Sequence, residues 1–170
     1  MQNFFALFRL EPKFNLDLNI LETHYRTIQS ATHPDRFVSA SAAEKLAAMQ
    51  AATYANEAYQ TLKHPTLRGT YLLKLQGIVA ISDNNTTMPT DFLLQQIEWR
   101  EIIEDHANNL SGLHHVMREL KQHTAHLQQV LTTEIDQQQN WTLAADTLRK
   151  LQFMDKLREE INRKIEALED

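Results

Sequence analysis

The sequence predicts an all-α protein built from two successive groups of helices. Only 3 glycines and 4 prolines occur among 170 residues, so the chain offers few of the tight turns that β-hairpins need. Long stretches are rich in Ala, Leu, Gln, Glu and Lys, which favour helices. Apolar residues in these stretches recur at steps of three and four, the spacing that places them on one helical face.

The first group begins with two helical pieces. Residues Phe4 to Leu10 predict a short helix or turn. Asp17 is suited to cap a longer helix that runs to about Ala31, because its carboxylate can accept from the free backbone N–H groups of the first turn. We expect this helix to bury one apolar stripe formed by Leu18, Leu21, Tyr25 and Ile28.

A third helix opens at the segment Ser41-Ala42-Ala43-Glu44, which has the form of a capping box. Its predicted apolar positions are Leu46, Met49, Ala52, Ala55 and Tyr59. Pro65 ends this helix and suits the first turn of a fourth one, which Gly77 can terminate. The two long helices and the loop around residue 33 therefore predict an antiparallel hairpin.

The chain divides between residues 77 and 90, where Asp83-Asn84-Asn85 favours a turn and Pro89 interrupts any helix. We expect a domain at 1–77, a linker at 78–89 and a second domain at 90–170. The second domain predicts three helices, which could form a three-helix bundle. One runs from about Thr90 to His106, one carries Leu113, Val116, Met117, Leu120, Leu127 and Leu131, and one runs from Trp141 to Leu168.

Composition excludes several classes of function. The net charge of −5 argues against a general nucleic-acid binder, which needs clustered Lys and Arg. The absence of cysteine excludes disulfides and thiolate chemistry. No apolar run approaches the length of a membrane span, and the N-terminus lacks the pattern of a signal peptide, so we expect a cytoplasmic protein.

The sequence gives little support for a metal site or for an enzyme. The chain has 8 histidines, of which His123 with His126 and His115 with Glu119 share helical faces. None forms a His-Glu-x-x-His motif, and no third ligand is evident from spacing. Neither a Gly-rich phosphate loop nor a nucleophile elbow occurs. We therefore expect no metal, no cofactor and no catalytic site.

The tripeptide His33-Pro34-Asp35 lies between the two long predicted helices. Pro34 fixes its own φ and favours an extended His33, which leaves Asp35 able to offer an acceptor to a partner. Taken alone, the tripeptide is also compatible with a simple polar turn. It is followed, however, by Asn56-Glu57-Ala58-Tyr59-Gln60-Thr61-Leu62 and then by Pro65, Arg68 and Tyr71. The combination resembles a J-domain, the module that stimulates ATP hydrolysis by DnaK-type chaperones.

Almost the full chain resembles the HscB family, the J-domain co-chaperones of iron–sulfur cluster assembly. The loop extends to Phe37, as that family's loop does, and the stretch from Ala144 to Leu157, Ala-Ala-Asp-Thr-Leu-Arg-Lys-Leu-Gln-Phe-Met-Asp-Lys-Leu, is similar to one typical of the family. The resemblance implies a J-domain followed by a three-helix bundle that binds the scaffold protein IscU. It also implies that the chaperone HscA is contacted by His33, Pro34, Asp35, Arg36 and Arg26.

The sequence departs from the family pattern at two places among the residues expected to contact the chaperone. Arg36 stands where Lys is more usual, which keeps the charge and changes the donor geometry. The helix before the loop is poor in cations, with Arg26 as the main one and His24 as a second candidate. This composition fits a dedicated chaperone such as HscA better than a general DnaK. The rival hypothesis is a J-protein whose C-terminal bundle recruits a different client.

The helix after Thr90 carries apolar residues on two faces. Phe92, Trp99 and Ile103 share one face, and Leu93, Leu94 and Ile97 point nearly the opposite way among Glu98, Glu101, Glu104 and Asp105. One apolar face suffices to dock a helix, so the second predicts a partner surface, unless neighbouring helices bury both. The resemblance implies that IscU binds Leu93, Leu94, Ile97, Glu98, Glu101, Asp105 and, from the last helix, Phe153. Ile97 and Asp105 stand where Leu and Glu are more usual.

Overall fold

The computed structural model describes residues 3–82 and 88–170, and all regular elements in these ranges are helical, which confirms the all-α prediction. The chain divides into two compact units, Met1–Leu72 and Leu73–Asp170. The turn predicted at Asp83–Asn85 lies outside the described residues. The expected linker at 78–89 stays a prediction. Within the described ranges, no helix combines the length and apolar composition needed to cross a membrane.

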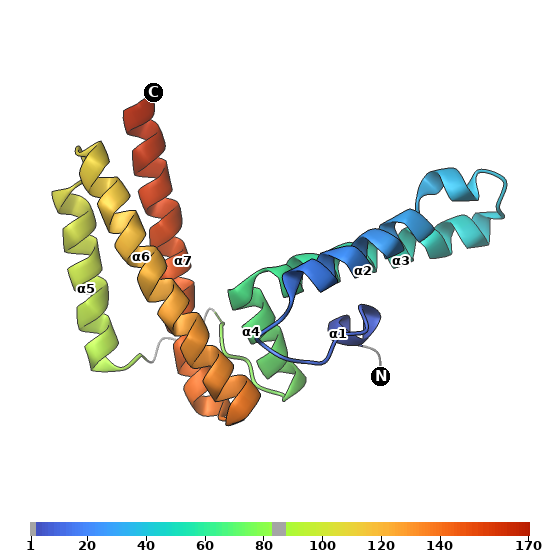
Figure 1. Cartoon of the computed structure of the whole chain (residues 1–170), viewed down its shortest axis with the longest axis horizontal. Helices are drawn as coiled ribbons and strands as arrows, with labels where there is room; N and C mark the ends of the chain where they lie inside the picture. Colours follow the sequence, from blue (N-terminus) through green and yellow to red (C-terminus); the bar gives the residue numbers. More distant parts are fainter. Residues whose placement is uncertain (1–2, 83–87) are drawn as a thin grey trace. The chain divides into compact units, whose positions relative to one another are not determined.

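The first unit is built on a helical hairpin (Figure 1). Helices α2 (Leu18–Ala31) and α3 (Ala42–Lys63) lie side by side, joined by a 3-10 turn at Pro34–Phe37. The short α1 (Phe4–Leu7) also contacts α3, and α4 (Pro65–Leu75) continues into the second unit. Both predicted N-caps are present, because the side chain of Asp17 accepts from Asn19 and Ile20 and that of Ser41 accepts from Glu44.

The hairpin is packed through small residues, which corrects part of the predicted stripes. Leu18, Leu46 and Met49 are exposed, although the sequence pattern placed them in the core. The buried positions of α3 are Ala48, Ala55, Ala58 and Leu62, of which only Ala55 belongs to the predicted stripe. Small residues thus take three of the four buried positions of α3, and the larger Leu46 and Met49 lie on its exposed side.

Arg68 joins distant parts of the first unit. Its side chain is buried, with the residue only 6% exposed. The Nε group donates to the carbonyl of Phe14 at 2.8 Å, and a terminal nitrogen donates to the carbonyl of Leu62 at 2.7 Å. The guanidinium also lies 4.9 Å from the centroid of the Phe14 ring. Arg68 therefore holds the N-terminal segment and satisfies a carbonyl at the end of α3, where helical carbonyls lack partners.

The second unit is the predicted three-helix bundle (Figure 1). It contains α5 (Thr90–Asp105), α6 (Leu110–Leu131) and α7 (Trp141–Glu169). Before them, Gly77 ends α4 as predicted, with a φ of 78° and a bond from the Ile78 N–H to the Leu73 carbonyl. The core of the bundle consists of Phe92, Trp99, Ile103, Leu113, Val116, Met117, Leu120, Met154, Leu157, Ile161 and Ile165.

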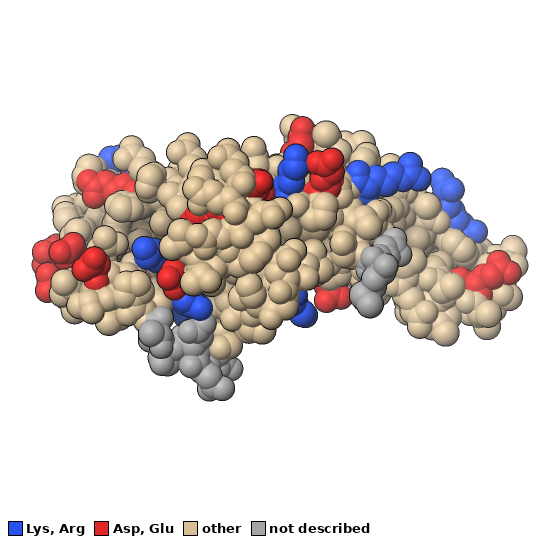
Figure 2. All heavy atoms as spheres, turned by 90° about the horizontal axis from the view of Figure 1, so that it is seen from below, with Lys and Arg blue, Asp and Glu red and all other residues tan. Residues whose placement is uncertain are grey.

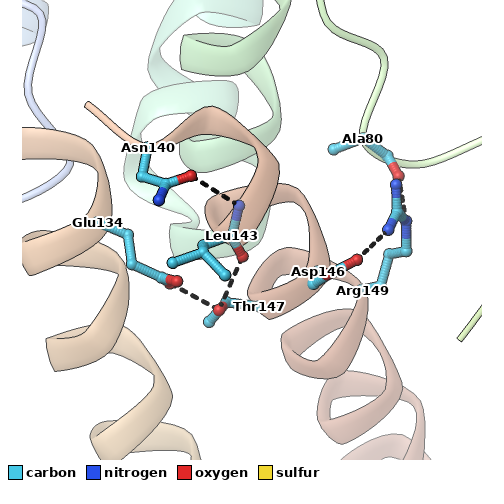
Figure 3. A network of polar contacts seen from close by, with 7 residues as sticks. All are labelled: Ala80, Glu134, Asn140, Leu143, Asp146, Thr147 and Arg149. Carbon is cyan, nitrogen blue, oxygen red and sulfur yellow. Dashed lines mark hydrogen bonds and ion pairs between the residues drawn. The ribbon is translucent and has the colours of Figure 1, made fainter. Parts of the chain in front are cut away.

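A π-helical turn at Thr132–Gln137, which the sequence analysis did not predict, connects α6 to α7. Figure 3 shows the polar network around it. Glu134 is only 7% exposed and accepts a hydrogen bond of 2.6 Å from the hydroxyl of Thr147. Nearby, Arg149 donates to the carbonyl of the buried Ala80 at 3.0 Å, which fixes the segment after α4 against α7.

We expect Arg68→Met to lower the free energy of unfolding by about 2–5 kcal/mol, because each buried carbonyl left without a donor costs about 1–3 kcal/mol. Arg68→Lys should also destabilise, since an ammonium cannot reproduce the fork of guanidinium donors. Urea unfolding of the full chain, followed by circular dichroism, measures the change. The control is Arg36→Met, an exposed position. Equal stability of the two methionine variants would contradict the assigned role.

Burial raises the pKa of Glu134, and the Thr147 hydrogen bond and Lys150 oppose that shift only in part. A raised pKa in the folded state means that stability is highest with Glu134 protonated and falls as pH rises through that pKa. Glu134→Gln keeps an acceptor for Thr147 and removes the charge. We expect Glu134→Gln to raise the melting temperature at neutral pH. Below neutral pH, the melting temperature of this variant should depend less on pH than that of the wild type. Glu159→Gln, at an exposed carboxylate, should do neither.

Candidate functional site

The His33-Pro34-Asp35 loop is a defined structure at the tip of the hairpin. His33 caps the 3-10 turn with extended backbone angles (φ −63°, ψ 136°), as predicted. Its Nδ1 accepts a bond of 3.2 Å from the Asp35 N–H, so the ring proton of the neutral imidazole lies on Nε2. The Asp35 side chain is 88% exposed. The loop thus presents an imidazole donor and a carboxylate acceptor to solvent, with the ring bonded to the backbone of the loop.

All five residues expected to meet a chaperone line one groove of about 900 Å³ beside this loop: Arg26, His33, Pro34, Asp35 and Arg36. Two further lining residues, Tyr25 and Asn56, were not predicted as site residues, and the Tyr25 hydroxyl donates to the Asn56 side chain at 3.1 Å. The sequence analysis assigned Tyr25 to the core stripe. Its ring does stack on Tyr59, with centroids 4.1 Å apart, while its hydroxyl reaches the groove.

The main cation of α2 has a partner within its own helix. Arg26 donates to Glu22 at 2.7 Å, and this hydrogen bond together with the opposite charge raises the pKa of the guanidinium. The Arg26 side chain is nonetheless mostly exposed. A chaperone that contacts Arg26 therefore meets a cation already partly neutralised by a carboxylate one turn away.

Helix α5 has two faces with opposite environments, as its sequence phase predicts. Phe92, Trp99 and Ile103 are 2%, 8% and 1% exposed. On the other side Leu93, Leu94 and Ile97 are 45%, 55% and 56% exposed. The alternative in which neighbouring helices bury both faces is therefore wrong for this structure. We call the outward surface formed by Leu93, Leu94, Ile97, Glu98, Glu101 and Asp105 the α5 face.

The α5 face is acidic as well as apolar. Helix α5 carries five carboxylates and one arginine, and Glu98, Glu101 and Asp105 are all exposed. Figure 2 shows carboxylates gathered at the left of the view, where α5 lies. Exposed apolar side chains set among charges of one sign form a surface suited to a partner that carries apolar and basic groups.

Phe153 lies at the border between this surface and the core. It is partly buried against the core cluster, with its ring edge-to-face on Phe92 at a centroid distance of 5.6 Å. The guanidinium of Arg100 lies 5.6 Å from its ring centroid. Phe153 thus supports the bundle, a role that the sequence analysis did not give it, and its ring also meets Arg100 of α5.

Histidines do not assemble a metal centre in the described parts of the chain. No group of three or more His, Asp or Glu residues there is placed to hold an ion. His115 instead pairs with Glu119 at 3.0 Å, and His123 packs edge-on against Trp99 at a centroid distance of 5.5 Å.

Comparison with known proteins identifies relatives of both units. Residues 88–162 match the family described as the HSCB C-terminal oligomerisation domain. A co-chaperone protein HscB homolog of Cupriavidus taiwanensis is 41% identical over 170 residues, covering 99% of this chain and 96% of that protein. A homolog from Burkholderia mallei is 45% identical over 171 residues, covering 97% and 95%.

Solved structures agree with these sequence matches. The chaperone HscB from Vibrio cholerae superposes with a TM-score of 0.86 at 36% identity, covering 98% of this chain and 99% of that one. These comparisons extend over both units, whereas the family match at residues 88–162 concerns the bundle alone.

Proposed function

The chain belongs to the HscB family of co-chaperones, and from that membership we propose that it recruits an IscU-type iron–sulfur scaffold protein to a DnaK-type chaperone of the HscA type and stimulates the chaperone's ATPase. In this proposal the protein is not itself an enzyme. It works in the cytoplasm and assists the maturation of iron–sulfur proteins. Residues 1–77 engage the chaperone and residues 90–170 hold the scaffold.

One observation carries the scaffold-binding part of this proposal. Helix α5 already buries a complete apolar face, so the bundle does not need Leu93, Leu94 and Ile97 for its own core. Leaving three such side chains in water has no benefit for folding, whereas a partner that covers them recovers roughly 25 cal/mol for each Å² of apolar area removed from water. The surrounding carboxylates then favour a basic partner and exclude acidic ones.

The chaperone-binding part rests on the loop geometry. Because His33 accepts from the Asp35 N–H, the histidine ring and the backbone at Asp35 are held in place before any partner arrives. A partner that uses both groups loses less conformational entropy than it would by ordering a mobile loop. The adjoining groove supplies the two arginines and a wall of polar groups from α2 and α3.

Coupling follows from having both surfaces in one chain. Binding the scaffold on α5 raises its effective concentration near a chaperone bound at the loop, without any new contact. The chaperone then hydrolyses ATP with the scaffold at hand. The co-chaperone positions the scaffold and stimulates the reaction, and the chaperone itself hydrolyses ATP.

We expect His33→Gln and Asp35→Asn each to abolish stimulation of the chaperone's ATPase. Asp35→Asn is isosteric, His33→Gln keeps a polar side chain, and both residues are exposed, so the helical circular dichroism should not change. Steady-state ATP hydrolysis by purified HscA, measured with and without the scaffold, tests the loop. Asp105→Asn, which lies on the α5 face, is the control for the charge change in the absence of scaffold. Full stimulation by both loop variants would remove the loop from the proposal.

The α5 face predicts a separation of binding from stability. The triple variant Leu93→Ala, Leu94→Ala and Ile97→Ala should melt near the wild-type temperature and bind the scaffold more weakly by at least about 100-fold, because each anchor contributes about 1–2 kcal/mol. Trp99→Ala should lower the free energy of unfolding by about 3–5 kcal/mol, as expected for a buried tryptophan.

Thermal melting and calorimetric titration of the scaffold on the same samples make this comparison. An early-melting triple variant beside a stable Trp99→Ala variant would mean that the two faces of α5 are reversed. Retained scaffold binding by a well-folded triple variant would favour a client that binds elsewhere, as the rival hypothesis requires.

A further inference from the structure

The two sides of α5 differ in how they meet the rest of the bundle. Towards α7 the seam is bridged by ion pairs, Arg100 with Glu160 at 2.8 Å and Lys164 with Glu104 at 3.5 Å. Towards α6 the described residues provide no ion pair. A groove of about 600 Å³ lies there instead. A partner seated on α5 therefore finds a closed seam on one side and an open groove on the other.

The groove has an apolar floor and polar walls. Trp99, almost buried, and Ile102, 36% exposed, belong to its floor. Glu98 and a glutamine form the α5 wall, and Glu119, His123, His126 and a second glutamine come from α6. The edge-on contact between His123 and Trp99 holds the imidazole at the floor of this groove.

The groove is continuous with the α5 face. Leu94, Glu98 and Ile102 are spaced four residues apart, which places them in one row along the helix. Leu94 belongs to the α5 face, Ile102 to the groove, and Glu98 to both. A segment that covers Leu94 needs only to continue along this row to enter the groove.

The charged residues that line the groove indicate which kind of partner segment it can bind. Carboxylates from both helices line the groove. Glu98 has no ion-pair partner among the described residues, and Glu119 lies 3.0 Å from His115 on its own helix. Long basic side chains can lay their aliphatic stems on apolar surface and keep the charged head among acceptors. A second copy of this chain, with a net charge of −5, is a poorer match for an acidic groove.

We propose that the α5–α6 groove receives a basic segment of the scaffold protein, with a Lys or Arg stem over Ile102 and the edge of Trp99 and its head at the carboxylates of Glu98 and Glu119. This inference rests on the proposed function and extends the binding surface onto α6. It adds Glu119, His123 and His126 to the residues that meet the scaffold.

Charge reversal in full-length protein tests the groove. Glu119→Lys should weaken calorimetric binding of the purified scaffold about tenfold, because like charges placed across an interface are strongly unfavourable. Glu119→Gln should have a smaller effect in the same direction. The matched control is Glu159→Lys, which changes an exposed carboxylate of α7 outside the groove and gives the same net charge. It should change binding less than about twofold, since distant surface charges are screened.

A second readout locates the partner. The chain contains two tryptophans, so 15N-tryptophan labelling gives two indole signals, which Trp141→Phe assigns. Unlabelled scaffold should shift or broaden the Trp99 signal. The proposal is wrong if Glu119→Lys and Glu159→Lys bind the scaffold equally well. It is also wrong if the Trp99 signal stays unchanged while the scaffold binds.

Two other outcomes are also decisive. If the wild-type chain binds no scaffold, the proposed function fails and the groove inference fails with it. If the Trp99 signal changes with the concentration of this chain alone, the groove is a contact between two copies and the proposed occupant is wrong.

Discussion

A unit of two or three long helices leaves part of its helix surface uncovered. Among the described residues, α2, α3, α5 and α6 each have a packed side and an exposed one, whereas residues 144–155 of α7 are buried or half-buried throughout. The packed faces set the fold, because the apolar stripes of α5, α6 and α7 bury one another. The free faces are where function can be placed without loss of core. Both candidate surfaces, the loop groove and the α5 face, obey this constraint.

The features predicted best from the sequence are those that depend on residues close together in the chain. The caps at Asp17 and Ser41 depend on residues within one turn, and the two faces of α5 depend only on helical phase. The stripe of α3 was predicted less well, since Leu46 and Met49 are exposed and alanines make the contact. Periodicity reveals that a helix has an apolar side, but the size of the residues at the contact is decided by how closely the facing helix approaches.

What sequence missed depends on contacts between distant segments. The π-helical turn after α6 is stabilised by Glu134 and Thr147, which come from different elements. The roles of Tyr25 and Asn56 in the loop groove appear only when α2 and α3 lie side by side. The α5–α6 groove has the same origin, because Trp99 and His123 meet only in the folded bundle. Asn56 belongs to a motif that the sequence shows, but its contact with Tyr25 does not follow from that motif, and no local pattern distinguishes the other residues from ordinary surface or core positions.

The pair between Glu22 and Arg26 has a consequence for the kinetics of encounter. A cation that lies beside a carboxylate presents a dipole at long range, and the field of a dipole falls off faster than that of a charge. This helix therefore contributes little electrostatic steering, the effect that can raise association rates by 10 to 1,000-fold. The contribution of α2 to an encounter is therefore nearly independent of ionic strength, whereas an isolated surface charge would make the association rate fall as salt is added.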